Sequence, residues 1–154
     1  MTPEDTDHLR RCVELAKIAA DRGDDPFGSV LVDSAGSVVA ERSNRVNTDR
    51  DVTAHPELLL AQWAGAHLSA EERAGATMYT SGEHCPMCAT ALVWAGIGRL
   101  VFVLTQRMIG DLAPPEATVF ELPARDVIAA SSATVIVEGP CPELVAEAAA
   151  LFRR

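Results

Sequence analysis

Basic residues are scarce in this 154-residue chain, and lysine is almost absent. The sequence holds 13 Lys and Arg against 22 Asp and Glu, so its formal net charge is −9, and Lys17 is its single lysine. Proteins that bind a nucleic-acid backbone carry a basic stripe or patch that neutralises phosphates. The charge balance therefore disfavours a nucleic-acid partner, while a local basic patch within the negative total stays open.

Long apolar runs and targeting features are also missing. No apolar stretch approaches the roughly 18 residues that a membrane-spanning helix needs. Met1–Asp5 is acidic and lacks the basic and apolar regions of a secretory signal peptide. In a chain without such a signal, a C-x-x-C pair indicates a metal or redox site rather than a disulfide. We expect a cytosolic protein that does not associate with membranes.

Repeats, low-complexity tracts and interdomain linkers are absent as well. The composition is that of an ordinary globular chain, with 48% hydrophobic and 23% charged residues. A chain of this length buries roughly 68–70% of the surface that its unfolded form exposes. Residues 1–154 are therefore expected to form a single domain.

Two short segments carry the residue types of a metal site. They read Thr-Ala-His-Pro-Glu at 53–57 and Glu-His-Cys-Pro-Met-Cys at 83–88. Cys85 and Cys88 are spaced so that two thiolates reach one metal, and His55 offers a nitrogen ligand. Three such ligands leave the fourth position of tetrahedral zinc open, which is typical of a catalytic site. Glu57 would then lie beside the site as a general acid and base.

The hydrophobic periodicity predicts an α/β chain. Helices are expected at Thr6–Arg22, Ala54–Ala64, Cys85–Ala95 and Glu143–Phe152. Strands are expected at Ser29–Asp33, Ser37–Arg42, Ala76–Ser81, Arg99–Thr105 and Ala133–Glu138, the first two as an antiparallel hairpin. The strand–helix–strand order over residues 76–105 predicts a parallel pair. The expected fold is a three-layer α/β/α domain with a five-stranded mixed sheet. Polar connections are expected at 43–50 and 69–72, and residues 106–130 give no clear pattern.

The two segments together resemble the signature of the cytidine/deoxycytidylate deaminase superfamily, H-x-E followed by P-C-x-x-C. Residues 83–88 are similar to the Ser-x-Glu-Pro-Cys-x-Met-Cys form of guanine, cytosine and tRNA adenosine deaminases. The resemblance implies a cytidine-deaminase-like fold in which His55, Cys85 and Cys88 bind Zn²⁺ and Glu57 shuttles protons. It implies a hydrolase that attacks a cyclic amidine with water and releases ammonia. It also implies a homodimer.

The resemblance further implies residues that contact the substrate: Phe27, Asn44, Ala54, His84, Trp94 and Glu143. Asn44 would bond the base from the end of the second strand. Trp94 would stack near the base, with core packing as its alternative. His84 stands where the family usually has Pro, and we expect it to contact the substrate or to support the metal ligands. Glu143 on the closing helix is a candidate pocket lid, with an ordinary surface charge as the alternative.

The predicted substrate is a free nucleobase or a similar aminated heterocycle, and guanine, cytosine and triazine-type rings all stay open. Residues 105–112 match poorly the basic, glycine-containing stretch of the tRNA branch, which together with the acidic charge favours a free base. A tRNA adenosine deaminase is the alternative, and salt-dependent RNA binding would reveal it. A structural zinc module, with His84 or Cys141 as fourth ligand, and a redox dithiol are the non-catalytic alternatives. Zinc content separates the redox dithiol from the zinc readings.

Overall fold

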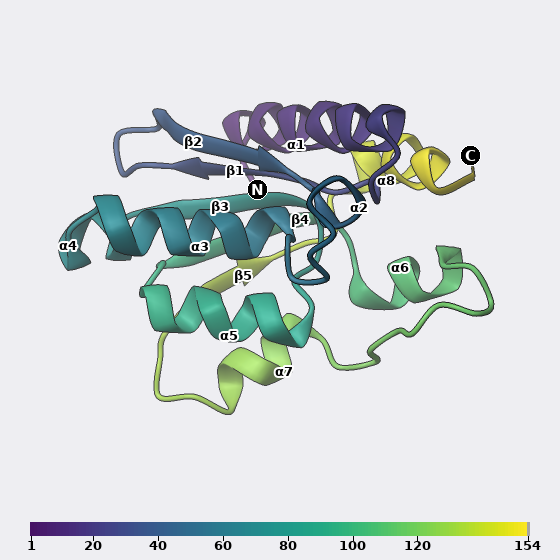
Figure 1. Ribbon diagram of the computed structural model, residues 1–154. Coiled ribbons are helices and arrows are strands. Elements are labelled where there is room, and N and C mark those ends of the chain that lie inside the picture. The colour runs from purple at the N-terminus through teal and green to yellow at the C-terminus, as the bar shows by residue number, and fades with distance from the viewer. Residues whose placement is uncertain (154) are drawn as a thin grey trace.

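A single mixed sheet forms the centre of the computed structural model, which describes residues 1–153 (Figure 1). Its strands are β1 Gly28–Val32, β2 Val38–Ser43, β3 Thr77–Gly82, β4 Arg99–Leu104 and β5 Ile136–Glu138, in the spatial order β2-β1-β3-β4-β5. β1 runs antiparallel to both β2 and β3, whereas β3, β4 and β5 are parallel to one another. The predicted hairpin and the predicted parallel pair are both confirmed.

Helices cover both faces of the sheet. They are α1 Pro3–Arg22, α2 Val46–Asp49, α3 Pro56–His67, α4 Ala70–Ala74, α5 Pro86–Ala95, α6 Gln106–Leu112, α7 Ala124–Ala129 and α8 Pro142–Ala150, followed by the 3-10 turn Leu151–Arg153. Figure 1 shows α1 and α8 on one face and α3, α5 and α7 on the other, so the three-layer prediction is also confirmed. Among the described helices, none is both long and apolar enough to cross a membrane.

The helices differ from the sequence prediction mainly where side chains cap them. α1 begins three residues earlier than predicted, because Thr2 and Asp5 form a capping box in which each side chain bonds the other's backbone N–H. The predicted polar connection near residue 70 contains α4, which Ser69 and Glu72 cap in the same way. The predicted loop before α3 contains the single turn α2.

The core lies in two layers, one on each face of the sheet. Side chains of β4 alternate between them: Val101 and Val103 pack with α1 and α8, whereas Leu100 and Phe102 pack with the layer under α3 and α5. This strand is buried from Leu100 to Leu104, which fits its near-continuous apolar sequence. The carboxyl ends of β3 and β4 lie side by side, because Gly82 pairs with Leu104. Ligands of open α/β sheets bind at such ends.

Candidate active site

Two helix N-termini meet at the carboxyl end of β3. His55 is the N-cap residue of α3 and Cys85 is the N-cap residue of α5, and each is followed by a proline at the first helical position. Proline fits there because its missing N–H would have no partner inside the helix. The motif prolines therefore fix where each helix begins, and thus where each ligand residue lies.

Gly82 allows the chain to pass tightly into this site. A Cβ atom at this position would lie 2.8 Å from Cδ1 of Ile109 and 2.9 Å from Cε1 of Phe27. Any other residue would push these two side chains apart. The glycine thus allows Phe27 to lie directly against the end of β3.

His55, Cys85 and Cys88 form the cluster that the sequence predicted as a metal site, with ligand atoms all within 4.8 Å of one another. His55 Nδ1 lies 3.7 Å from Cys85 Sγ and 3.6 Å from Cys88 Sγ. Zinc bonds of about 2.0 Å to nitrogen and 2.3 Å to sulfur, at tetrahedral angles, place such atoms roughly 3.5 Å apart. The three side chains therefore fit Zn²⁺, and Nδ1 is the ring nitrogen that would bind it.

The protonation of the cluster favours a cation. The Cys88 thiol and His55 hydrogen-bond the Cys85 sulfur, and these bonds lower the pKa of Cys85 to about 4. The same contact with Cys85, followed by the charge of Glu57, raises the pKa of His55. The hydrogen bond with Cys85, followed by burial, raises the pKa of Cys88. The lowered pKa of Cys85 favours its thiolate, which is the form of cysteine that binds metal.

Glu57 lies beside the cluster and is almost fully buried, with 5% of its surface exposed. Burial raises the pKa of its carboxyl group. One carboxylate oxygen accepts a hydrogen bond of 3.1 Å from Thr80 Oγ1, and the other lies 3.7 Å from Cys88 Sγ. Thr80 in turn accepts a bond of 2.8 Å from Ser29 Oγ, its cross-strand partner. A buried chain of two hydroxyl groups thus holds the carboxylate that the sequence assigns to proton transfer.

A cavity of about 840 Å³ opens beside these residues. His55, Glu57 and Cys85 line it, together with Phe27, Asn44, most of residues 109–120 of the chain between β4 and α7 (all but Asp111, Pro115 and Glu116), and Phe152 near the C-terminus. Its acidic lining residues are Asp24, Asp25, Glu57 and Glu83, and none of its described lining residues is Lys or Arg. Cavities of this size typically bind small molecules, and the described lining of this one offers no Lys or Arg to a phosphate.

Asn44 and Phe27 line the cavity. Asn44 is 1% exposed; its Oδ1 accepts a bond of 3.0 Å from the backbone N–H of Val46. Within residues 1–153 its amide nitrogen has no protein partner, so this group is available to a ligand. The ring of Phe27 meets that of Phe152 edge to face at 5.5 Å, which gives the cavity an aromatic corner.

Trp94 and Glu143 do not lie at the cavity. Trp94 is 84% exposed on α5. It follows Cys88 by six residues, roughly 240° around a helix, and so it points away from the metal ligands. Glu143 is exposed on α8, and the part of that end of the chain that lines the cavity is Leu151 and Phe152 instead. Their predicted contacts with a substrate gain no support from this arrangement.

His84 and Ala54 are buried behind the cavity surface. Glu83 and Cys85 both line the cavity, so the side chain between them turns into the protein, where His84 is 0% exposed. Burial lowers the pKa of His84 to about 3, and neither ring nitrogen has a hydrogen-bond partner in the described part of the chain. Ala54 is 2% exposed and its carbonyl accepts from the N–H of Arg45, so it shapes the loop before α3. Neither side chain lines the cavity, so this arrangement does not support their predicted contacts with a substrate, while the alternative that His84 supports the metal ligands stays a prediction.

Sequence reasoning missed three polar residues of the site: Ser29, Thr80 and Glu83. Their signal was available, because each is a polar residue in or directly after an otherwise apolar strand, where burial requires a partner. The partners, however, come from distant parts of the chain. Only the tertiary structure identifies them.

Comparison with known proteins places this geometry in context. A family model described as the cytidine and deoxycytidylate deaminase zinc-binding region matches residues 2–104. The probable cytosine deaminase of Schizosaccharomyces pombe (strain 972) is 32% identical over 142 residues, covering 91% of this chain and 86% of that protein. The guanine deaminase of Bacillus subtilis (strain 168) is 41% identical over 88 residues, covering 56% of this chain and 56% of that protein.

A solved structure is similar over nearly its whole length. It comes from biochemical and structural studies of A-to-I editing by tRNA:A34 deaminases at the wobble position of transfer RNA. It superposes with a TM-score of 0.72 at 28% sequence identity, covering 95% of this chain and 99% of that one. These similar proteins act on different substrates according to their names, so the similarity gives the chemistry and does not select the substrate.

Proposed function

The chain belongs to the cytidine and deoxycytidylate deaminase family, with zinc as its metal, and we propose that it hydrolyses the amino group of a free nucleobase or a similar aminated heterocycle. The observation that carries the proposal is the cavity. It combines the His55–Cys85–Cys88 cluster and Glu57 with a lining that holds acidic residues and no described Lys or Arg.

The residues support hydrolysis as follows. Zinc, when bound, supplies a Lewis acid that makes a water molecule nucleophilic near neutral pH. Glu57 takes one proton of that water and gives it to the ring nitrogen, while the water oxygen bonds to the amidine carbon. Glu57 then carries the second proton to the exocyclic amine. The carbon–nitrogen bond breaks, and ammonia leaves behind a ring carbonyl group. Thr80 keeps the carboxylate in place for both transfers.

Asn44 and Phe27 are the residues that would orient the substrate ring in the cavity. The amide nitrogen of Asn44 can donate to a carbonyl oxygen or ring nitrogen of the heterocycle. Phe27 offers an aromatic surface for contact with a flat ring. A neutral heterocycle satisfies both contacts without bringing a charge into a cavity whose described lining holds no Lys or Arg to pair with it.

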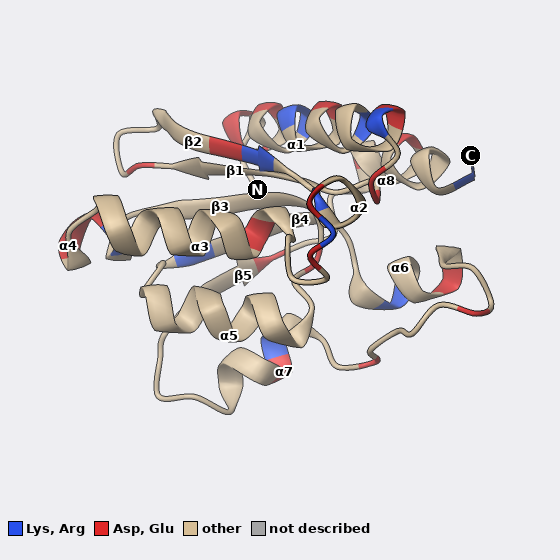
Figure 2. Cartoon of the chain, viewed as in Figure 1, with Lys and Arg blue, Asp and Glu red and all other residues tan. Residues whose placement is uncertain are grey.

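Phosphorylated substrates are disfavoured by the same electrostatics. Two arginines next in sequence to lining residues are already paired: Arg22 bonds Asp24 at 2.6 Å, and Arg45 bonds Asp49 through two contacts of 2.9 Å. A phosphate bound by either of these two arginines would have to compete with its carboxylate partner. Figure 2 shows acidic and basic residues intermixed around α2, rather than a basic stripe.

The second candidate is a tRNA adenosine deaminase, which the 28% identical editing-enzyme structure favours. That activity uses the same chemistry, so only the substrate separates the two. A non-catalytic redox dithiol has no use for His55 and Glu57 beside the two cysteines.

The decisive experiment is an ammonia-release assay with zinc-loaded protein. The panel holds guanine, cytosine, adenine, their nucleosides and nucleoside monophosphates, aminated triazines and a tRNA anticodon stem-loop. We expect release from a free ring, weaker release from the matching monophosphate, and none from a Glu57→Gln variant that still binds zinc. Release confined to the stem-loop would establish the RNA-editing alternative. No release from any compound would refute the deaminase proposal for this chain.

We also propose that the protein forms a homodimer through α3 and α5. Figure 2 shows no Lys, Arg, Asp or Glu along α5, and the single charged residue of α3 before His67 is the buried Glu57. Trp94 exposes 84% of its surface on this side. Helices that are apolar on all sides are normally covered, and large exposed apolar patches mark protein interfaces.

Two further expectations stay as proposals. Residues 1–154 would act as one deaminase-like domain around the single described sheet. The protein would work in the cytosol, since the site needs reduced cysteines and the four cysteines of the chain form no disulfide with one another.

A further inference from the structure

Glu83 is a buried acid at the edge of the active site that takes no part in the metal cluster. It lies two residues before Cys85 and is 7% exposed. Its Oε2 accepts a hydrogen bond of 2.7 Å from the backbone N–H of Gln106, and its Oε1 accepts one of 2.9 Å from the backbone N–H of Ala124. Both carboxylate oxygens are therefore used, and both partners are main-chain groups from far along the sequence.

The two partners bracket the segment that closes the cavity. Gln106 is the first residue of α6 and Ala124 is the first residue of α7. The Glu83 carboxylate therefore binds the chain at both ends of the segment that joins the two helix starts. Figure 1 shows the connection between α6 and α7 as an open arc that stands away from the sheet. The side-chain amide of Gln106 adds one tie across the arc, with a bond of 3.2 Å to the carbonyl of Phe120.

The arc has little structure of its own. Apart from the bond between Gln106 and Phe120, the backbone of residues 114–122 makes one hydrogen bond in the described chain. It joins the N–H of Ala117 to the carbonyl of Pro114 in a turn. Val119 and Phe120 line the cavity, yet they are 45% and 56% exposed, so packing holds them weakly. Segments with few backbone bonds and few buried contacts open readily unless something pins them.

We propose that Glu83 is a positioning residue that pins residues 113–122 as the apolar wall of the substrate cavity. The wall presents Val119 and Phe120 to the face or edge of a flat heterocycle, so Glu83 controls substrate affinity without touching substrate or metal. A carboxylate suits this task because both its oxygens accept, whereas glutamine has one acceptor and would turn an NH₂ group toward a backbone N–H. The substrate part of the inference rests on the deaminase activity proposed above.

The test is amide exchange and backbone relaxation by NMR on the zinc-loaded protein without substrate. In Glu83→Gln, we expect the amides of Gln106 and Ala124 to exchange at least about tenfold faster, because hydrogen bonds to charged groups contribute that much to a local opening equilibrium. The order parameters of residues 115–122 should fall below about 0.6, the range of flexible backbone. Zinc content should stay at the wild-type value.

Glu116→Gln is the matched control, since it makes the same chemical change at an exposed position of the same arc. It should leave exchange and order parameters unchanged. With a substrate from the panel, Glu83→Gln should raise KM while kcat stays within about threefold, and Glu116→Gln should change neither. Wild-type exchange rates in Glu83→Gln would overturn the proposal. Loss of zinc would also overturn it, because Glu83 would then be needed to hold the neighbouring cysteines in place for the metal.

If Glu83→Gln does not fold, Ala124→Pro removes one donor and leaves the carboxylate intact. Position 124 begins α7, where proline is tolerated, and Pro123 already has the extended φ and ψ of −64° and 149° that a following proline requires. Lower order parameters at Val119 and Phe120, with zinc retained, would support the pinning, and unchanged ones would refute it. None of these NMR measurements needs turnover, so silence in the ammonia assay would count against the deaminase proposal alone.

Discussion

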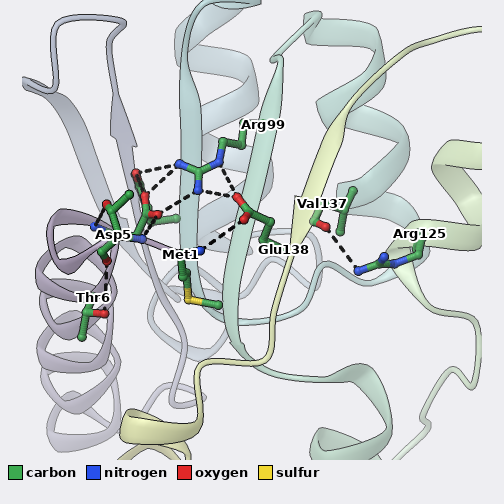
Figure 3. A network of polar contacts seen from close by, with 9 residues as sticks. Met1, Asp5, Thr6, Arg99, Arg125, Val137 and Glu138 are labelled. Atoms are coloured by element: carbon green, nitrogen blue, oxygen red, sulfur yellow. Dashed lines mark hydrogen bonds and ion pairs between the residues drawn. The ribbon is translucent and has the colours of Figure 1, made fainter.

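Arg99 is predicted to be the most sensitive charged residue for stability. It is the first residue of β4, at the end of the strand opposite the active site. Its side chain bonds residues of α1 and β5 (Figure 3). Its guanidinium makes two bonds of 2.8 Å to the carboxylate of Asp5, and it also bonds Glu138. Asp5 is 2% exposed and takes two further bonds, of 2.6 Å from the Tyr79 hydroxyl and 2.7 Å from the N–H of Thr2.

The expected loss follows from leaving a buried charge without its partner. In Arg99→Met the apolar stem is kept and the guanidinium is removed, so the change isolates the charge. Breaking a buried ion pair by removing one partner costs about 3–5 kcal/mol of unfolding free energy. For a domain of this size each kcal/mol lowers Tm by about 2–4 °C, so Tm should fall by roughly 6–20 °C.

The loss should depend on pH in a definite direction. The hydrogen bonds from Arg99 hold the pKa of Asp5 far below its ordinary value. The wild-type contribution is therefore complete above the unfolded pKa of about 3.9 and declines as the pH falls below it. Without Arg99, burial raises the pKa of Asp5, and the variant recovers stability when that carboxyl is protonated. The difference between the two proteins should thus shrink from pH 7 to pH 3.

Urea unfolding at pH 7 and at pH 3, followed by circular dichroism, measures both effects. Arg125→Met is the control, because its guanidinium donates one bond of 3.3 Å to the Val137 carbonyl at the surface (Figure 3). This control should lose less than about 0.5 kcal/mol. A loss below about 1 kcal/mol in Arg99→Met, or a loss equal at both pH values, would refute the reasoning.

Three further predictions concern the site and the assembly. Cys88→Ala should abolish stoichiometric zinc binding, as measured by metal analysis, because it removes one of three ligands; full zinc occupancy would show that the ligand set is different. Thr80→Val should lower kcat roughly 10- to 100-fold with little change in KM, since it removes a hydrogen bond to the Glu57 carboxylate, while Thr80→Ser keeps the hydroxyl and should retain most of the activity. Equal kcat in the two variants would remove Thr80 from this role. Trp94→Asp should convert the dimer to a monomer in sedimentation experiments with zinc content unchanged, and a monomeric wild type would contradict the proposed interface.

The metal cluster was predictable because its geometry is local within each half. Cys85 and Cys88 lie at the start of one helix and His55 at the start of another, and a proline marks each start. The spacing of the two cysteines then places both sulfurs on one side of the first turn. What could not be predicted locally is that the starts of α3 and α5 lie next to each other, because the sheet brings them together.

The substrate-facing residues were harder, because a side chain's direction depends on what lies around it. Trp94 belongs to a helix whose start was predicted correctly, but the same helix turns it to the solvent. His84 adjoins a ligand, yet the alternation of side chains along the loop sends it into the core. The arc between α6 and α7 is bonded at both ends to Glu83, which lies directly after β3. No local sequence pattern connects Glu83 to Gln106 or Ala124.

The sequence by itself determined the layers, the antiparallel hairpin and the parallel pair, since each follows from hydrophobic period and chain order. It also predicted the two separate halves of the His55–Cys85–Cys88 cluster. The tertiary structure alone decided the shape and charge of the cavity, the hydrogen bonds from Ser29 to Thr80 and from Thr80 to Glu57, and the two backbone hydrogen bonds to Glu83. The physical reason is range. Periodicity and capping act over a few residues, whereas a buried polar group must find its partner wherever folding brings one within about 3 Å.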